Sequence, residues 1–277
     1  MYSILEHYLS TNHILMIGMI VTFILTFFLL EHPFSFLPSD QGRAFAVNGS
    51  LSKGKLRGVG FIFVLCFLIS SVLFLPIDVE YVIYAILLFA MMISGYLDDA
   101  SKTPWNEYKK GLIDLVISVV AVLTYMNFNS TTICFGADEI VIPKALFLIL
   151  GVILIWVSVN VTNCTDGVDG LCASLCSVTL LAFGVLFAPI LQKYAMANFL
   201  FLSVLFAYLY FNSSPSSMLM GDAGSRALGF YIAVIALKST HPFIYILLAA
   251  VMIVDGGIGL VTVSYTHLRA HETLRHL

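Results

Sequence analysis

Long apolar runs separated by short polar segments constrain this chain more than any other feature. A helix of about 20 apolar residues crosses the hydrocarbon core of a bilayer, where it satisfies its own backbone hydrogen bonds. Hydrophobic residues make up 60% of the chain and charged residues 10%, against about 25% charge in a soluble domain. The runs, most of about 16 to 22 residues, lie at 14–31, 57–75, 79–97, 111–127, 142–160, 171–190, 194–211, 226–239 and 242–263. We therefore predict an all-α, multi-pass transmembrane helix bundle in the lipid bilayer.

The distribution of lysine and arginine predicts the orientation of this bundle. When loops are numbered by the run that they follow, the even loops hold only Lys144, Lys193 and Lys238. Loops one, three and seven hold a larger set: Arg43, Lys53, Lys55, Arg57, Lys102, Lys109, Lys110 and Arg226. Because such cations concentrate on the cytoplasmic side, we predict an outside N-terminus and cytoplasmic odd loops at the plasma (inner) membrane. The net charge of −3 argues against a nucleic-acid partner.

A polar, glycine-broken segment separates the fifth and sixth runs. It carries two amides, Asn160 and Asn163, and two acids, Asp166 and Asp169, at three-residue intervals. On a helix or a helical turn this spacing places all four side chains on one face. Such a group beside a membrane suits a cation or a polyphosphate ligand, although an Asx-rich helix cap is the alternative explanation. We predict that these four residues bind substrate.

Two further acidic motifs occur in odd loops. Asp98 and Asp99 end the third run, and Asp222 lies between Gly221 and Gly224 near the start of the eighth. Adjacent carboxylates repel each other unless a cation is near, and Mg²⁺ takes a few carboxylates while keeping positions for water and phosphate. Each motif alone could equally be an ordinary helix end or cap. Their shared placement predicts one Mg²⁺-dependent active site with Asp98, Asp99 and Asp222 as catalytic residues.

The first loop is basic and contains glycine. Its cations Lys53, Lys55 and Arg57 fit two roles, the binding of a diphosphate or attachment to an anionic leaflet at about 1 kcal/mol each. We include Lys53 among the predicted substrate-binding residues.

Three motifs in this order resemble the polyprenyl-phosphate hexose-1-phosphate transferase superfamily (glycosyltransferase 4), and within it most of all the phospho-N-acetylmuramoyl-pentapeptide-transferases. They are Leu97-Asp-Asp99, Asn160-Val-Thr-Asn-Cys-Thr-Asp-Gly-Val-Asp-Gly-Leu171 and Met220-Gly-Asp-Ala-Gly-Ser225. The middle motif is the most specific of the three. The similarity in span layout covers most of residues 14–263.

The resemblance implies a reaction and roles for individual residues. Undecaprenyl phosphate would attack UDP-N-acetylmuramoyl-pentapeptide, giving lipid I for peptidoglycan synthesis and releasing UMP. Asp98 and Asp99 would serve Mg²⁺ and the lipid phosphate, with Asp99 and Asp222 as metal ligands. The nucleotide-sugar pocket would be lined by the following residues: Asn163, Asp166, Asp169 and, near the uridine, Asn212. The resemblance leaves a homodimer open.

The sequence departs from this family at three places. Leu219 stands where the family usually has an aromatic residue, and Lys55-Leu-Arg-Gly-Val-Gly60 is a loose relative of the usual first-loop motif. The family has a tenth span, whereas residues 264–277 break abruptly in composition. We interpret 1–263 as a membrane-embedded transferase domain that lacks its last span, and 264–277 as a non-native tail.

Three alternative functions remain open from the sequence. The first is a transferase of N-acetylglucosamine-1-phosphate or a related sugar, because Met220-Gly-Asp-Ala-Gly-Ser225 is shared with those enzymes. An ion-coupled transporter would also carry intramembrane acids, but near the midplane and commonly in two related halves. An inactive remnant is the third possibility, given the shortened C-terminus.

Overall fold

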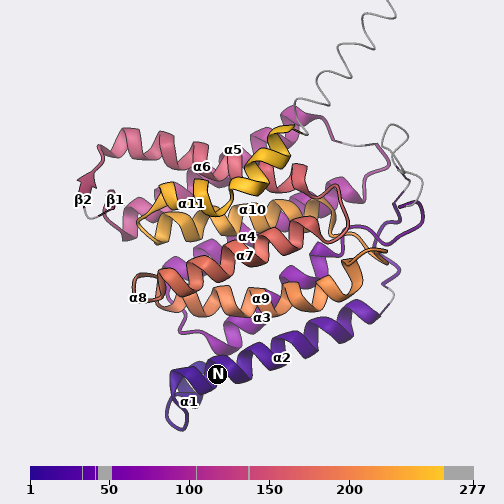
Figure 1. The fold of residues 1–277 in the computed structure, drawn as a ribbon, viewed down its shortest axis with the longest axis horizontal. Helices are drawn as coiled ribbons and strands as arrows, with labels where there is room; N and C mark the ends of the chain where they lie inside the picture. Colours follow the sequence, from indigo (N-terminus) through magenta and orange to yellow (C-terminus); the bar gives the residue numbers. More distant parts are fainter. Residues whose placement is uncertain (33, 41, 43–51, 104, 137, 259–277) are drawn as a thin grey trace, which may run out of the picture.

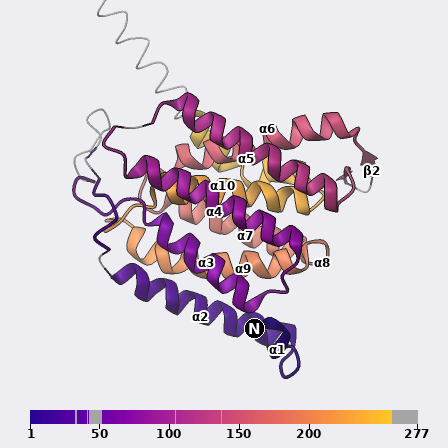
Figure 2. The same cartoon turned by 180° about the vertical axis from the view of Figure 1, so that it is seen from behind.

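The computed structural model describes residues 1–258 apart from 33, 41, 43–51, 104 and 137. Its helices lie side by side along the long axis of the molecule, and Figures 1 and 2 show them from the front and from behind. Arg43 and the predicted tail 264–277 lie outside the described residues. The helices are α1 (Tyr2–Leu5), α2 (Thr11–Glu31), α3 (Gly60–Phe74), α4 (Val79–Asp99), α5 (Glu107–Phe128), α6 (Lys144–Thr165), α7 (Leu171–Leu186), α8 (Ala188–Leu191), α9 (Lys193–Asn212), α10 (Gly221–Lys238) and α11 (Pro242–Leu248). The predicted all-α, multi-pass membrane bundle is confirmed.

Each of the nine predicted runs contains a helix, but fewer of these helices qualify as spans. Among the described residues, five helices are long and apolar enough to cross a membrane, namely α2, α4, α5, α6 and α9. The apolar helices α3 and α7 are shorter. The run predicted at 242–263 is interrupted at Ala249, after which residues 250–258 are helical. The nine spans and the outside N-terminus therefore stay predictions.

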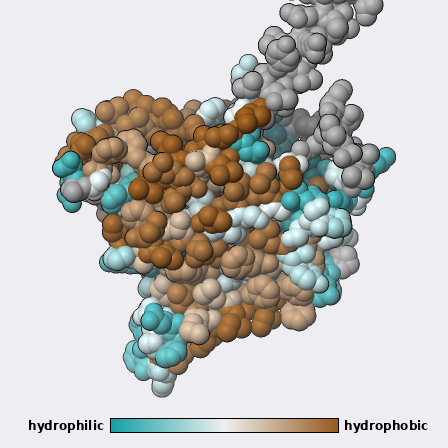
Figure 3. Space-filling view, viewed as in Figure 1, coloured by the Kyte–Doolittle hydropathy of each residue, from teal (hydrophilic) through white to brown (hydrophobic). Residues whose placement is uncertain are grey.

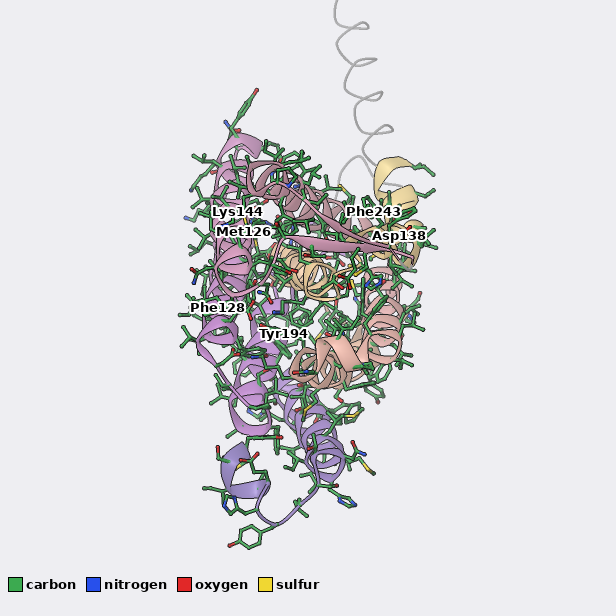
Figure 4. All side chains as sticks on the ribbon, turned by 90° about the vertical axis from the view of Figure 1, so that its left-hand side faces the viewer. Met126, Phe128, Asp138, Lys144, Tyr194 and Phe243 are labelled. Atoms are coloured by element: carbon green, nitrogen blue, oxygen red, sulfur yellow. The ribbon has the colours of Figure 1, made fainter. Side chains whose placement is uncertain are left out.

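The surface divides into an apolar middle and two polar ends. Figure 3 shows hydrophobic residues across the middle of the bundle and hydrophilic residues gathered at its left and right ends. This pattern fits a protein whose helices span a bilayer from end to end. The left end carries an antiparallel hairpin of β1 (Thr132–Phe135) and β2 (Asp138–Val141). This end faces the viewer in Figure 4, where Asp138 and Phe243 are labelled.

Several helix starts follow from capping residues in the sequence. The Asp78 side chain accepts a hydrogen bond from the Tyr81 amide at the start of α4, and Asn106 does the same for Tyr108 in α5. Such caps satisfy amides that have no partner within the helix. The start of α7 instead follows Gly170, which has a left-handed conformation at φ 77°.

Helix α10 is the centre of the bundle. All residues from 221 to 237 are buried, and the helix packs mainly against α4 and α6 (Figure 1). It begins at Gly221, five residues before the predicted start at 226, so Asp222 belongs to its first turn. Three charged residues, Asp222, Arg226 and Lys238, explain why this buried helix is less apolar than a typical span. Its first turn carries the acidic motif into the body of the protein.

Candidate active site

Backbone hydrogen bonds join the first loop to the segment that precedes α10. The Leu219 amide donates to the Leu56 carbonyl at 2.8 Å, and the Gly60 amide donates to the Met220 carbonyl at 3.0 Å. Leu56 and Met218 form an isolated parallel bridge. These contacts hold the start of α3 against the start of α10, at the end of the bundle opposite the hairpin (Figure 1).

Two glycines allow the end of α4 to approach the start of α10 closely. A Cβ atom added to Gly95 would lie 2.3 Å from the Asp222 carbonyl oxygen. Gly221 has φ +66°, and a Cβ atom there would lie 2.4 Å from an Asp99 carboxylate oxygen. Left-handed backbone at φ near +60° favours glycine. The close approach is what brings the Asp98–Asp99 pair next to Asp222.

Replacement of Gly95 by alanine is expected to separate α4 from α10. The added methyl group would meet backbone atoms of Asp222 and Ala223, which cannot rotate away, and overpacking of this kind costs about 1–3 kcal/mol. We expect a lower melting temperature in detergent together with lost transfer activity. Gly257→Ala is the matched control, because a Cβ atom there meets nothing within 4 Å. Equal melting temperatures for both variants would contradict the close approach.

Arg57 links carboxylates from three different segments. Its Nε donates to Asp99 Oδ1 at 2.8 Å, and its two terminal nitrogens lie 3.4 Å from Asp222 Oδ1 and 3.5 Å from Asp40 Oδ1. The Asp99 side chain is fully buried and also accepts a hydrogen bond from the Ala223 amide at 3.0 Å. Burial acts to lower the pKa of Arg57, but Asp99, Asp222 and Asp40 together raise it above its ordinary value. Arg57 therefore stays charged among these acids.

Lys110 is the second cation in the acidic cluster. Its Nζ lies 2.6 Å from Asp98 Oδ2 and 3.4 Å from Asp222 Oδ2. The other oxygen of Asp98 accepts a hydrogen bond from the Trp105 amide at 2.7 Å. Asp98, Asp99 and Asp222 thus lie around two shared cations, and we call these three residues the acidic cluster. Carboxylates this close need positive charge between them.

The acidic cluster offers oxygen donors of the kind that Mg²⁺ takes, although its carboxylates contact basic side chains. Within the described residues, no three Asp, Glu, His or Cys side chains are arranged to hold a metal ion. Mg²⁺ is nevertheless often held by one or two carboxylates, with water and substrate phosphate as its other ligands. Asp99 and Asp222, both within reach of Arg57, supply such a pair of hard oxygen donors. The residues present therefore fit the expected ion.

The four polar residues of the 160–171 motif do not share one helix face, so that expectation is wrong. Helix α6 continues through Asn160 and Asn163 but ends at Thr165, and Asp166 has non-helical ψ of 48°. Asn160 and Asn163 line a cavity together with Asp222. The Nδ2 of Asn163 also donates to the Ser225 hydroxyl at 2.9 Å. The motif thus divides into a helical half beside the acidic cluster and a loop half.

The loop half of the motif meets the first loop and the segment before α10. Asp169 accepts a hydrogen bond from the Ser216 amide at 2.9 Å, and Lys55 Nζ lies 3.6 Å from the same carboxylate oxygen. Slight burial raises the pKa of Asp169, but Ser216 and Lys55 outweigh it and hold the pKa below its ordinary value. Lys53 is exposed, and no described contact joins it to these acids. Lys55 is the first-loop lysine that reaches the motif.

Asn212 connects two of these loops instead of facing open space. It is 3% exposed, accepts a hydrogen bond from the Gly170 amide at 3.0 Å and donates to the Met218 carbonyl at 2.9 Å. These bonds fix the end of α9 relative to both motifs. Its predicted contact with a uridine stays a prediction.

The structure adds residues that the sequence did not single out for the site. Arg57 and Lys110 entered the sequence argument mainly as cations that indicate membrane orientation, and Asp40 and Asp114 were not considered. Asp114 pairs with Arg226 in the interior, where the two side chains are 4% and 3% exposed. Buried charges near one another are a signal of function, but only their tertiary contacts reveal it.

Comparison with known proteins identifies the family. Residues 81–240 match glycosyl transferase family 4, a segment that includes most of α4, all of α5 to α10 and the whole acidic cluster. The chain belongs to this family. The match covers more than half of the 277 residues, and it confirms the resemblance drawn from the three motifs. It also confirms that the chain is a transferase.

Three similar curated relatives of the chain carry the same name. Phospho-N-acetylmuramoyl-pentapeptide-transferase of Treponema pallidum (strain Nichols) is 34% identical over 94% of this chain and 78% of its own length. The enzyme of the same name from Halalkalibacterium halodurans is 28% identical over 88% of this chain and 81% of its own. A third, from Dictyoglomus turgidum, is 25% identical over 88% and 80%. The chain is therefore similar to members of this one branch of the family along most of its length.

Proposed function

We propose that the chain transfers phospho-N-acetylmuramoyl-pentapeptide from its UDP form to undecaprenyl phosphate, giving lipid I and UMP with Mg²⁺ as cofactor. The relatives' shared name supports the transferred group. The observation that carries the chemistry is the acidic cluster, in which carboxylates from α4 and α10 share Arg57 and Lys110. The proposal includes an active site on the cytoplasmic face of the plasma membrane, where the sugar nucleotide is found.

Phosphoryl transfer between two anions needs charge neutralisation and alignment more than a strong nucleophile. A bound Mg²⁺ would supply positive charge to the transferring phosphate, and Asp99 and Asp222 would hold it. Asp98 accepts a hydrogen bond from the Trp105 amide and pairs with Lys110. This pairing holds Lys110 near Asp222, where the lysine can contact a diphosphate. A phosphate monoester is already mostly ionised near pH 7, so the acceptor needs no strong base from the protein.

Arg57 and the proposed Mg²⁺ neutralise the same carboxylates. Arg57→Gln removes a charge from beside Asp99 and Asp222, so we expect a lower melting temperature in detergent without divalent ions. Millimolar Mg²⁺ should then raise the melting temperature of the variant more than that of the wild type. Lys53→Gln is the control, because Lys53 is exposed and has no described contact with the cluster. The same Mg²⁺ response in all three proteins would contradict a shared site.

The substrate is tested by supplying membranes that contain the protein with a panel of radiolabelled UDP-sugars and undecaprenyl phosphate. We expect label to enter lipid from UDP-N-acetylmuramoyl-pentapeptide with stoichiometric UMP release. Label that enters only from UDP-N-acetylglucosamine would overturn the proposed donor and favour the other transferases that share the Met220–Ser225 motif.

A further inference from the structure

A second polar feature lies beside the acidic cluster, deeper in the bundle. A cavity of about 270 Å³ lies between α5, α6 and α10. Arg226 borders it one helical turn along α10 from Asp222, which is a rise of about 6 Å at 1.5 Å per residue. The reaction proposed above assigns no role to Arg226, although Lys110 and Asp222 also line this cavity.

Arg226 is buried with most of its hydrogen-bonding capacity unused. The residue is 2% exposed, and one terminal nitrogen, Nη2, pairs with Asp114 Oδ1. Its Nε and Nη1 atoms are buried and have no hydrogen-bond partner among the residues that the structure describes. A guanidinium group carries five N–H donors and keeps its charge at any physiological pH. Three donors of a buried cation that borders the cavity are therefore unused among the described residues.

The other polar groups around the cavity suit an oxyanion. Asn160 and Asn163 line it. The Nδ2 of Asn160 donates to the Trp156 carbonyl, which leaves its second N–H available. The side chain of Asn163 hydrogen-bonds both the Ser225 hydroxyl and the Asp222 carboxylate. Each of the three acids that line the cavity has a basic partner: Asp114 pairs with Arg226, and Asp222 and Glu107 pair with Lys110. A planar arginine fork with an adjacent amide matches the oxygens of a phosphate.

We propose that Arg226, with Asn160, binds the phosphate of the membrane-anchored acceptor, an inference that rests on the proposed function. Trp156 borders the cavity and is 41% exposed, so the wall of the cavity reaches the surface of the apolar helix α6. A phosphate on a lipid chain can approach from that side. The site lies one turn from Asp222, which places the acceptor oxygen next to the proposed metal.

Trp156 provides a direct reporter of this binding. The chain has two tryptophans, and Trp105→Phe leaves Trp156 as the only one while keeping the amide that contacts Asp98. Farnesyl phosphate in detergent should change Trp156 emission saturably, and inorganic phosphate should compete with it. Farnesol, which lacks the phosphate, should not produce the change at the same concentration. An equal response to farnesol, or no response to farnesyl phosphate, would overturn the proposal.

Variants of the buried pair separate phosphate binding from a structural role. In the Trp156 reporter, the double variant Asp114→Asn, Arg226→Gln removes both charges together and should weaken farnesyl phosphate binding at least tenfold. Asp114→Asn alone keeps the guanidinium group and should bind at least as tightly as the parent. Arg226→Lys retains the charge beside Asp114 without the fork and should bind more weakly at an unchanged melting temperature. Equal affinity in all four proteins, or equal losses in Asp114→Asn and the double variant, would overturn the proposal.

Transfer kinetics distinguish this inference from the proposed function. In Arg226→Lys we expect a higher KM for the lipid acceptor and an unchanged KM for the sugar nucleotide. An unchanged acceptor KM would overturn the acceptor site while the proposed reaction stands. Binding of farnesyl phosphate that depends on Arg226, with no transfer from any UDP-sugar, would support the phosphate site and overturn the proposed function. Binding of inorganic phosphate without farnesyl phosphate would overturn the assignment to a lipid acceptor.

Discussion

Asp222→Asn is expected to lower UMP release by roughly 10²–10³-fold, the loss that follows removal of one electrostatic group aimed at a transition state. The asparagine keeps the shape of the side chain but loses the negative charge that faces Arg57 and Lys110. The carboxylate also belongs to the pair proposed to hold Mg²⁺, so the loss should fall on the rate and not only on substrate binding. The measurement is single-turnover UMP release at saturating substrates.

Asp138→Asn is the matched control for this substitution. Asp138 is exposed on β2, at the hairpin end seen in Figure 4, far along the bundle from the acidic cluster. Its substitution removes the same charge and should leave UMP release unchanged. A transition-state group should show a far larger loss than a factor of about two. If the rate of UMP release by Asp222→Asn stays within that factor of the wild-type rate, Asp222 does not belong to the active site.

Lys238→Met is expected to destabilise the protein by about 3–5 kcal/mol, because it leaves the buried Glu80 carboxylate without its cationic partner. Lys238 Nζ lies 3.0 Å from both oxygens of Glu80 and 2.7 Å from Asn129 Oδ1. The Glu80 and Lys238 side chains are only 8% and 12% exposed. The free energy of unfolding in detergent measures the effect.

Two comparisons show whether burial is the cause. Lys193 pairs with Asp78, whose side chain is 53% exposed, so Lys193→Met should cost less than about 1 kcal/mol. The double variant Glu80→Gln, Lys238→Met removes both charges and should recover most of the lost stability. Equal effects of Lys238→Met and Lys193→Met would mean that the buried pair contributes no more than a surface one.

The sequence predicts the bundle well because its signal is local. An apolar run long enough to span a membrane forms a helix wherever it lies, and each predicted run contains one. Helix ends are harder to predict from hydropathy. Polar Asn163 still belongs to α6 and Asp222 already belongs to α10, because polar residues are well tolerated in terminal turns. The error at Asp166 and Asp169 arises from the same cause, since the helical spacing continues in sequence after the helix has ended.

The motifs predicted that Asp98, Asp99 and Asp222 would meet, and these residues do share two cations in the structure. The identity of those cations could not be predicted. Arg57 and Lys110 are long side chains on segments far apart in sequence, and which carboxylate each one reaches depends on how α3, α4, α5 and α10 pack. Close approach at Gly95 and Gly221 is likewise a property of packed helices and not of local sequence.

Binding of Mn²⁺ in place of Mg²⁺, counted by electron paramagnetic resonance on the purified protein, tests the central claim most directly. If the carboxylates of α4 and α10 share one ion, we expect a single bound Mn²⁺ per chain in the wild type. Binding should be lost in Asp99→Asn and in Asp222→Asn, and should be retained in Asp138→Asn. Wild-type affinity for Mn²⁺ in both of the first two variants would contradict a metal site formed between the two helices.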